Sequence, residues 1–335
     1  MYKLGIIIGR FQPVTDFHIN EIFKPALKNS DYVLVILGSA DRARSPRDPF
    51  SSHMVENMIR VATEHLSKTP KLFFARVRDY WYSETKWLAD IQTEVQAFTD
   101  QHYDEDVDIT LYGAEGSQYD FLNKFPQWNV FTSKAKAPEF DILSDIFEYQ
   151  DEWMRYVNPQ VYNDIKVWFN SDEGRKMTEE YHYLEKYKAS TQIGKYPIVF
   201  QTVDNIVVYK GNILLVQRRA KPGRGLWALP GGFLEPDETL FRSALRELRE
   251  ETNLNVKEEW LVAQETFDAP QRSLRGRTIT RAFLWKIPDW REVPQVKANS
   301  DAAKAKWFPI ATVRQMAGKM FEDHLDIIEE MLERL

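Results

Sequence analysis

The chain of 335 residues is longer than one average domain and predicts two domains of about 150 residues each, and its 43% hydrophobic and 13% aromatic content excludes a disordered chain. It has no cysteine, so disulfides, thiolate metal sites and cysteine nucleophiles are excluded. A net charge of −6, from 44 basic and 50 acidic side chains without a long basic tract, argues against nucleic-acid binding and favours small-molecule chemistry.

The first half alternates between predicted strands and predicted helices. Short apolar runs at 3–9, 32–38, 71–77 and 107–112 predict strands, and polar stretches long enough for crossover helices follow the first two. Residues 87–98 have helical periodicity. This order predicts an α/β fold with a parallel sheet and helices on both faces.

A new pattern begins near the middle of the chain. Residues 145–188 are helical and rich in aromatic side chains, and we interpret them as the end of the first domain plus a connector. Runs at 206–209 and 213–217 flank a Lys-Gly-Asn turn and predict a hairpin, and residues 320–335 predict an amphipathic C-terminal helix. We therefore predict two domains, residues 1–188 and residues 189–335.

Residues 9–18, GRFQPVTDFH, follow the first predicted strand and begin the first predicted helix. Nucleotides bind at this place in parallel sheets, because a glycine ends the strand without a side chain and the helix offers free N–H groups to phosphate. Thr15 and His18 are three residues apart in the first helical turn, so both can face one ligand. The alternative is that a lone histidine near a strand end is structural.

Residues 231–254, GGFLEPDETLFRSALRELREETNL, predict a helix whose carboxylates share one face. Glu247, Glu250 and Glu251 stand at i, i+3 and i+4, where like charges repel, so a divalent cation, magnesium or manganese, would compensate them. Asn253 follows the helix and is expected in a left-handed cap. The alternative is an acidic helix whose glutamates face water.

This segment resembles the Nudix box, with Glu238 upstream of the run Arg-Glu-Leu-Arg-Glu-Glu at 246–251. The resemblance implies diphosphate hydrolysis and an α/β/α sandwich domain. Residues 225–230 resemble the approach to the box, and residues 267–277 resemble a loop of ADP-ribose-type members. That loop carries three arginines that could bind phosphate or ribose oxygens or simply be solvated: Arg272, Arg275 and Arg277.

The same resemblance implies roles around the cation. Glu247 and Glu251 would be the main metal ligands, with Gly232 beside them and Glu250 as a further ligand or a water-activating base. Nudix enzymes often take their base from a loop, so Glu265 is a second candidate and the base stays open.

The N-terminal segment resembles the signature of nucleotidyltransferases, and Gly-Arg-Phe-Gln-Pro resembles the nicotinamide mononucleotide adenylyltransferase branch. The resemblance implies a Rossmann-like domain in which Thr15 and His18 are catalytic, with His18 stabilising charge on the α-phosphate of ATP. Trp87 could stack on nicotinamide or belong to the core. The segments that match the family supply these nucleotide-binding candidates: Gly9, Arg10, Phe11, Arg44, Trp87, Gly113 and Ser144.

Three residues depart from that family's pattern. Phe17 replaces a glycine, Ala114 replaces a histidine, and Phe147 stands where a phosphate-binding arginine is usual. Arg10 and Arg44 are among the cations that could replace the lost arginine.

Together the two resemblances imply a bifunctional enzyme. Its first half would make NAD and diphosphate from ATP and nicotinamide mononucleotide, and its second would hydrolyse ADP-ribose to AMP and ribose 5-phosphate with Mg²⁺ or Mn²⁺. One alternative is a Nudix hydrolase whose first domain only binds a nucleotide as a sensor. Another keeps both enzymes but with other substrates.

The remaining expectations concern partners and location. No run reaches the ~18 apolar residues of a membrane span, and the chain begins with a strand-like run instead of a signal sequence, so we expect no membrane partner and a cytoplasmic location. We expect no nucleic-acid partner, and the sequence leaves a homo-oligomer open.

Overall fold

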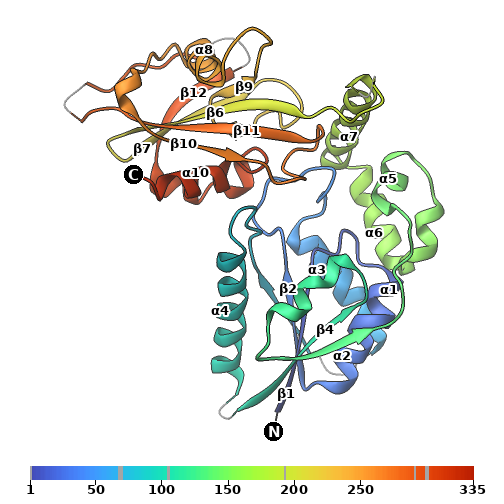
Figure 1. Ribbon diagram of the computed structural model, residues 1–335. Helices are drawn as coiled ribbons and strands as arrows, with labels where there is room; N and C mark the ends of the chain where they lie inside the picture. The colour runs from blue at the N-terminus through green and yellow to red at the C-terminus, as the bar shows by residue number, and fades with distance from the viewer. Residues whose placement is uncertain (1, 67–70, 104–105, 192–193, 290–291, 299–301) are drawn as a thin grey trace. The chain divides into compact units, whose positions relative to one another are not determined.

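The structure is a computed structural model that describes residues 2–66, 71–103, 106–191, 194–289, 292–298 and 302–335. It divides into two compact units (Figure 1). Unit 1 comprises Met1–Ala40 and Arg44–Glu179, and unit 2 comprises Asp41–Ala43 and Glu180–Leu335. The division falls within helix α7 (Asp172–Thr191). The predicted boundary at residue 188 stays a prediction.

Unit 1 is built on a five-stranded sheet in the order β3-β2-β1-β4-β5. Every neighbouring pair is parallel, as the alternating pattern predicts. Residues 4–8 of the central strand are all buried because both faces of the sheet are covered, which explains its continuous apolar run. The strands are β1 (Tyr2–Gly9), β2 (Tyr32–Leu37), β3 (Leu72–Arg76), β4 (Val107–Ala114) and β5 (Asn129–Ser133).

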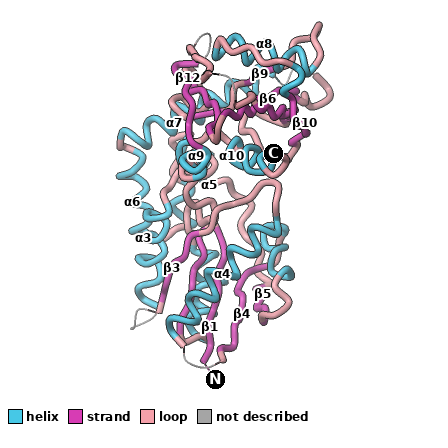
Figure 2. The backbone as a smooth tube through the Cα atoms, turned by 90° about the vertical axis from the view of Figure 1, so that its left-hand side faces the viewer, coloured by secondary structure: helices cyan, strands magenta, loops and turns pink. Residues whose placement is uncertain are grey.

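Helices cover both faces of this sheet, which confirms the predicted architecture. Figure 1 shows α4 on one side and α2 and α3 on the other, and Figure 2, viewed from the α4 side, shows that helix in front of the strands. The first helical segment is continuous from α1 through a π-helical stretch, η1, into α2. The elements are α1 (Asp16–His18), η1 (Ile19–Phe23), α2 (Lys24–Asn29), α3 (Ser52–Thr63), η2 (Glu64–Leu66), α4 (Glu84–His102), η3 (Ser117–Lys124), α5 (Ile142–Phe147), η4 (Glu152–Tyr156) and α6 (Pro159–Phe169).

Unit 2 contains a seven-stranded mixed sheet with the main order β10-β11-β6-β7-β12. In addition, β8 pairs with β7, and β9 pairs with β6. Figure 1 shows α8 and α10 on opposite faces of this sheet, as expected for an α/β/α sandwich. The strands are β6 (Phe200–Tyr209), β7 (Asn212–Arg218), β8 (Trp227–Ala228), β9 (Gly231–Phe233), β10 (Leu261–Phe267), β11 (Thr278–Lys286) and β12 (Ala302–Pro309). The helices are α8 (Leu240–Thr252), η5 (Glu258–Trp260), α9 (Ile310–Arg314), η6 (Ala317–Lys319) and α10 (His324–Leu332).

The predicted hairpin is present between β6 and β7. Lys210 and Gly211 connect the strands with φ of 44° and 73°, the positive values that a tight two-residue hairpin turn requires. The C-terminal helix begins later than predicted, because Phe321 donates its backbone N–H to the carbonyl of Trp227 before α10 begins. In the part of the chain that the structure describes, no helix has the length and apolar character needed to cross a membrane.

Candidate active sites

In unit 1, the loop after β1 is shaped by a close contact between Gly9 and Phe11. Phe11 has a φ of 49°, and its ring lies so close to Gly9 that a Cβ there would be 2.6 Å from the ring. Gly9 is therefore needed for packing as well as for ending the strand. The loop lies at the carboxyl ends of β1 and β4, where the strand order reverses and nucleotides bind in such sheets.

Thr15 and His18 bond to each other at the start of α1. The Nδ1 atom of His18 lies 3.0 Å from the backbone nitrogen of Thr15 and 2.8 Å from its hydroxyl. The hydroxyl also accepts the backbone N–H of His18 at 3.4 Å, so its own proton is available for Nδ1. The imidazole proton is thereby assigned to Nε2, which no described residue binds.

The surroundings of His18 favour the neutral imidazole. Burial lowers the pKa of His18 from 6.5 to about 4. The rings of Phe11 and Phe17 contact the imidazole edge-on, with centroids 5.2 and 5.9 Å away. At neutral pH the side chain is therefore an uncharged donor through Nε2–H.

Two predicted phosphate-binding arginines are paired with carboxylates. Arg10 lies 3.0 Å from Asp79 and 3.9 Å from Asp48, and Arg44 bonds to Glu173. A nucleotide phosphate would have to compete with these partners, so the binding roles of Arg10 and Arg44 stay predictions.

The other predicted contacts in unit 1 have clear packing roles. A Cβ on Gly113 would lie 2.7 Å from the side chain of Leu122, so the helical turn after β4 packs directly on this glycine. Trp87 is half-buried and packs on Phe121 and Phe125, with ring centroids 6.0 and 6.2 Å away. These rings support the core interpretation of Trp87, and its stacking on nicotinamide stays a prediction.

The end of unit 1 holds the last two positions that the family pattern singled out. Ser144 lies in α5, where its backbone N–H bonds to the capping side chain of Asp141, and its binding role stays a prediction. Phe147, in the last turn of that helix, is fully buried. Its ring is therefore part of the core, and its place as the substitute for a phosphate-binding arginine stays a prediction.

In unit 2, α8 presents its glutamates as the spacing predicts. Thr239 caps the N-terminus by accepting the backbone N–H of Arg242, and Asn253 ends the helix with a φ of 58°. The predicted left-handed cap is thus confirmed. Of the clustered carboxylates, Glu247 and Glu251 are largely buried, and Glu250 is about half-exposed.

Arg246 organises the acidic side chains. It donates two hydrogen bonds, of 2.6 and 3.0 Å, to Glu238, as well as bonds of 2.8 Å to Glu247 and 3.2 Å to Glu250. The paired arginine lowers the pKa of Glu238 to about 2. Glu238 therefore stays ionised and fixes the guanidinium that holds the other two.

The backbone of β9 touches the two buried carboxylates. The Gly231 N–H donates to Glu251 at 3.0 Å, and a Cβ on Gly232 would be 2.3 Å from the Oε1 atom of Glu247. Burial raises the pKa of Glu247, and burial together with the charge of Glu247 raises the pKa of Glu251 to about 8.

These two carboxylates fit a hard divalent cation, since a positive ion would offset both burial and repulsion. No group of three or more His, Asp or Glu side chains that could hold an ion occurs within the described ranges. Glu250 in particular is turned to Arg246. The metal roles of Gly232 and the three glutamates stay predictions.

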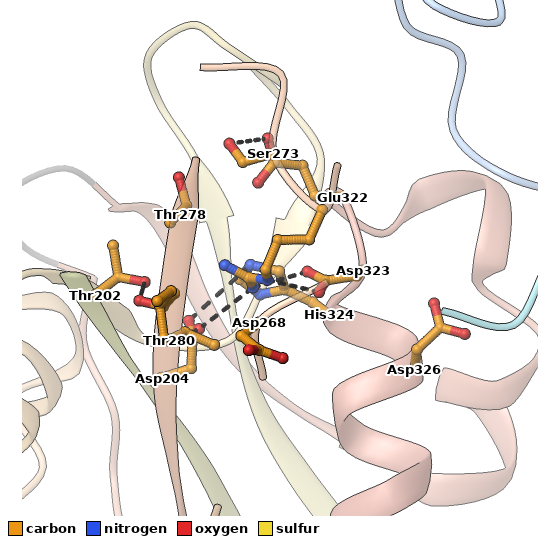
Figure 3. A network of polar contacts seen from close by, with 12 residues as sticks. Thr202, Asp204, Asp268, Ser273, Thr278, Thr280, Glu322, Asp323, His324 and Asp326 are labelled. Atoms are coloured by element: carbon orange, nitrogen blue, oxygen red, sulfur yellow. Dashed lines mark hydrogen bonds and ion pairs between the residues drawn. The ribbon is translucent and has the colours of Figure 1, made fainter. Parts of the chain in front are cut away.

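The three loop arginines have different surroundings. Arg272 is buried and donates two hydrogen bonds, of 2.7 and 2.8 Å, to Asp323, so its guanidinium already has an interior carboxylate partner. Figure 3 shows Asp204 across this network from Asp323 and His324, and Asp204 lies 4.0 Å from Arg272 and 4.0 Å from His324. Arg277 bonds to the carbonyl of Asp268. The binding roles of Arg272 and Arg277 stay predictions.

Arg275 instead lies over aromatic rings. Its guanidinium carbon is 5.2 Å from the ring centroid of Phe233 and 5.7 Å from that of Phe321. A second arginine, Arg218 at the end of β7, lies 4.0 Å from the Phe321 centroid. Burial, together with the charge of Arg275, lowers the pKa of Arg218, while the charge of Glu251 acts in the opposite direction. Two guanidiniums therefore share one region with a buried carboxylate of α8.

Sequence reasoning missed Arg218 and also Glu322. Glu322 has a φ of 44°, and Ser273 and Leu274 bind its Oε1 atom at 2.7 and 3.2 Å. Its Oε2 atom is buried without a hydrogen bond from the described residues, with Arg275 at 3.6 Å. The position of Arg218 at a strand end is the one signal in the sequence that could have drawn attention to it, and nothing in the sequence marks Glu322. The expected alternative, Glu265, forms a partly exposed ion pair with Arg334.

Comparison with known proteins gives matches to both units. The NUDIX domain model matches residues 200–331. An ADP-ribose pyrophosphatase of Methanocaldococcus jannaschii is 31% identical over 45% of this chain and 85% of its own length. A nicotinamide/nicotinic acid mononucleotide adenylyltransferase of Acinetobacter baylyi is 30% identical over 39% of this chain and 67% of its own length.

One similarity spans both units. The crystal structure of a bifunctional NMN adenylyltransferase/ADP ribose pyrophosphatase from Francisella tularensis, complexed with AMP and a manganese ion, has a TM-score of 0.90 and 30% sequence identity. The match covers 99% of each chain. The chain therefore belongs to the family of bifunctional NMN adenylyltransferases/ADP-ribose pyrophosphatases.

Proposed function

We propose that the protein is a bifunctional enzyme of NAD metabolism. Unit 1 joins ATP and nicotinamide mononucleotide to give NAD and diphosphate, and unit 2 hydrolyses ADP-ribose to AMP and ribose 5-phosphate. The main support is the similarity over 99% of the chain to the bifunctional NMN adenylyltransferase/ADP ribose pyrophosphatase of Francisella tularensis. The fit of β9 against Glu247 and Glu251 supports the hydrolase independently.

In the hydrolase, Glu247 and Glu251 would hold Mg²⁺ or Mn²⁺, with Glu250 as a further ligand. The cation would supply positive charge to the diphosphate and acidify a bound water. Arg218 and Arg275 would bind the diphosphate oxygens of ADP-ribose. The support is that both guanidiniums lie on the ring of Phe321 and that the charge of Glu251 acts on the pKa of Arg218.

Glu322 is our first candidate for the base that takes the proton of the attacking water. Its Oε2 atom has no hydrogen-bond donor among the described residues and only an ion pair with Arg275, at 3.6 Å. A non-glycine residue at positive φ is often maintained at a functional site. Glu250 is the second candidate, but Arg246 holds its carboxylate.

In the transferase, a phosphate oxygen of nicotinamide mononucleotide attacks the α-phosphorus of ATP, and the bond to the β-phosphate bridging oxygen breaks. His18 would donate its Nε2–H to an α-phosphate oxygen as charge develops there. Thr15 keeps the proton on Nε2 by bonding to Nδ1. Arg10 and Arg44 would bind the leaving diphosphate after exchanging their carboxylate partners.

Two substitutions test this division of labour. His18→Ala should abolish NAD formation and leave ADP-ribose hydrolysis intact, and Glu251→Gln should do the reverse, with both variants folded as judged by circular dichroism. Loss of both activities in either variant would contradict the proposal of two independent sites.

The alternative of a nucleotide sensor in unit 1 has a simple test. A transferase releases diphosphate from ATP only when nicotinamide mononucleotide is present, whereas a sensor binds ATP without releasing diphosphate under any condition. The cytoplasmic location and a homo-oligomeric state stay predictions.

A further inference from the structure

We propose that Asn205 is a positioning residue of the hydrolase. Its side chain sets the spacing between β9 and α8, and thereby the places of Glu247 and Glu251. This inference rests on the proposed hydrolase function of unit 2.

Asn205 lies in β6 and is completely buried. Its Nδ2 group donates to the carbonyl of Pro230 at 3.2 Å and to the carbonyl of Ala244 at 3.0 Å. The backbone N–H of Asn205 also donates to Pro230, at 2.8 Å. Pro230 directly precedes β9, and Ala244 is in α8, three residues before Glu247. One amide group therefore links the two segments that meet at the carboxylates.

Trp285 fixes the orientation of that amide. Its indole Nε1–H donates to the Oδ1 atom of Asn205 at 2.9 Å, also in a completely buried setting. If the amide were flipped, an N–H would face the indole N–H, and an oxygen would face the two carbonyls. Trp285 thus ensures that both Nδ2 protons point to Pro230 and Ala244.

The spacing between β9 and α8 is close at the two carboxylates. The missing Cβ of Gly232 would be 2.3 Å from the carboxylate of Glu247, and the Gly231 N–H is 3.0 Å from Glu251. A shift of α8 relative to β9 would change both contacts together. Displacements of about 1 Å at a reacting site can cost ~10²-fold in rate.

Two variants and a matched control test the proposal. Asn205→Asp keeps the size but puts an oxygen opposite the two carbonyls, and Trp285→Phe removes the orienting donor. Trp307→Phe is the control, because Trp307 packs on the same core cluster and its Nε1–H donates at 3.0 Å to Pro294, away from the carboxylates. Each protein is assayed for kcat and KM with ADP-ribose, for the Mn²⁺ dissociation constant by electron paramagnetic resonance, and for its melting temperature.

Asn205→Asp and Trp285→Phe should lower kcat at least tenfold and weaken Mn²⁺ binding, with KM for ADP-ribose changed less than kcat. Trp307→Phe should keep both wild-type values even if its melting temperature falls. Unchanged kcat and Mn²⁺ affinity in folded Asn205→Asp, or equal losses in the two tryptophan variants, would overturn the proposal.

If Asn205→Asp does not fold, Trp285→Phe decides the question against its control. If the wild-type protein does not hydrolyse ADP-ribose, the proposed function fails, and the Mn²⁺ affinities of the variants still decide whether Asn205 positions the carboxylates.

Discussion

Gly232→Ala is the substitution whose effect follows most directly from the geometry of the hydrolase site. The added methyl carbon would lie 2.3 Å from Oε1 and 2.6 Å from Cδ of Glu247, whereas ordinary contacts of such a carbon begin at 3.4 Å. The carboxylate must therefore move by about 1 Å, a displacement that can cost ~10²-fold in rate, or about 3 kcal/mol of transition-state stabilisation. We expect this loss in kcat/KM for ADP-ribose.

The assay follows AMP release from ADP-ribose at saturating Mg²⁺. Gly194→Ala is the matched control, because the nearest contact of its added carbon among the described residues beyond its chain neighbours is the carbonyl of Tyr196 at 3.9 Å. It should keep wild-type activity. NAD formation by Gly232→Ala should also be unchanged. A folded Gly232→Ala variant with wild-type kcat/KM would refute the placement of Glu247 in the active site.

Three other outcomes are expected. Glu322→Gln should lower kcat for ADP-ribose by ~10²-fold or more, which is the usual loss when a general base is removed. Glu265→Gln should change kcat little, and the reverse result would assign the base to Glu265. Chelation with EDTA should abolish ADP-ribose hydrolysis, and added Mg²⁺ or Mn²⁺ should restore it; hydrolysis that survives chelation would contradict a metal-dependent site. The pKa of His18 is about 4 when folded and 6.5 in the reference state, so the unfolded chain binds a proton first as pH falls. The free energy of unfolding should therefore be highest above pH 6.5 and decrease toward pH 4. The decrease between pH 7 and pH 5 should be about 2 kcal/mol. The melting temperature of His18→Asn should fall less over that range than that of the wild type, and equal falls would contradict the neutral imidazole.

Local rules were enough to predict the box helix and the parallel sheet. The cap at Asn253 depends on the residue itself, and the spacing of Glu247 and Glu251 depends only on helix geometry. The other strands of unit 1 were likewise visible in the sequence as short apolar runs. The exception was β5, whose residues are mostly exposed and therefore lack the apolar run that marks a covered strand.

Long-range pairing could not be predicted from one sequence. Arg272 is separated from its buried partner Asp323 by 51 residues, so the loop pattern alone gave no reason to place it in the interior. The same limit explains why Glu322 was missed: its partner Ser273 lies in a loop 49 residues earlier, and its positive φ has no glycine or asparagine signal.

The most direct test of the bifunctional assignment is a product analysis of the purified protein with Mg²⁺, ATP and nicotinamide mononucleotide, followed by chromatography. The transferase is the decisive half, because Phe17 and Ala114 depart from the family pattern at its site. We predict NAD and diphosphate in equal amounts, dependent on both substrates. ADP-ribose hydrolysis by the same preparation without any NAD formation would contradict the assignment and leave a Nudix hydrolase with a nucleotide-binding domain.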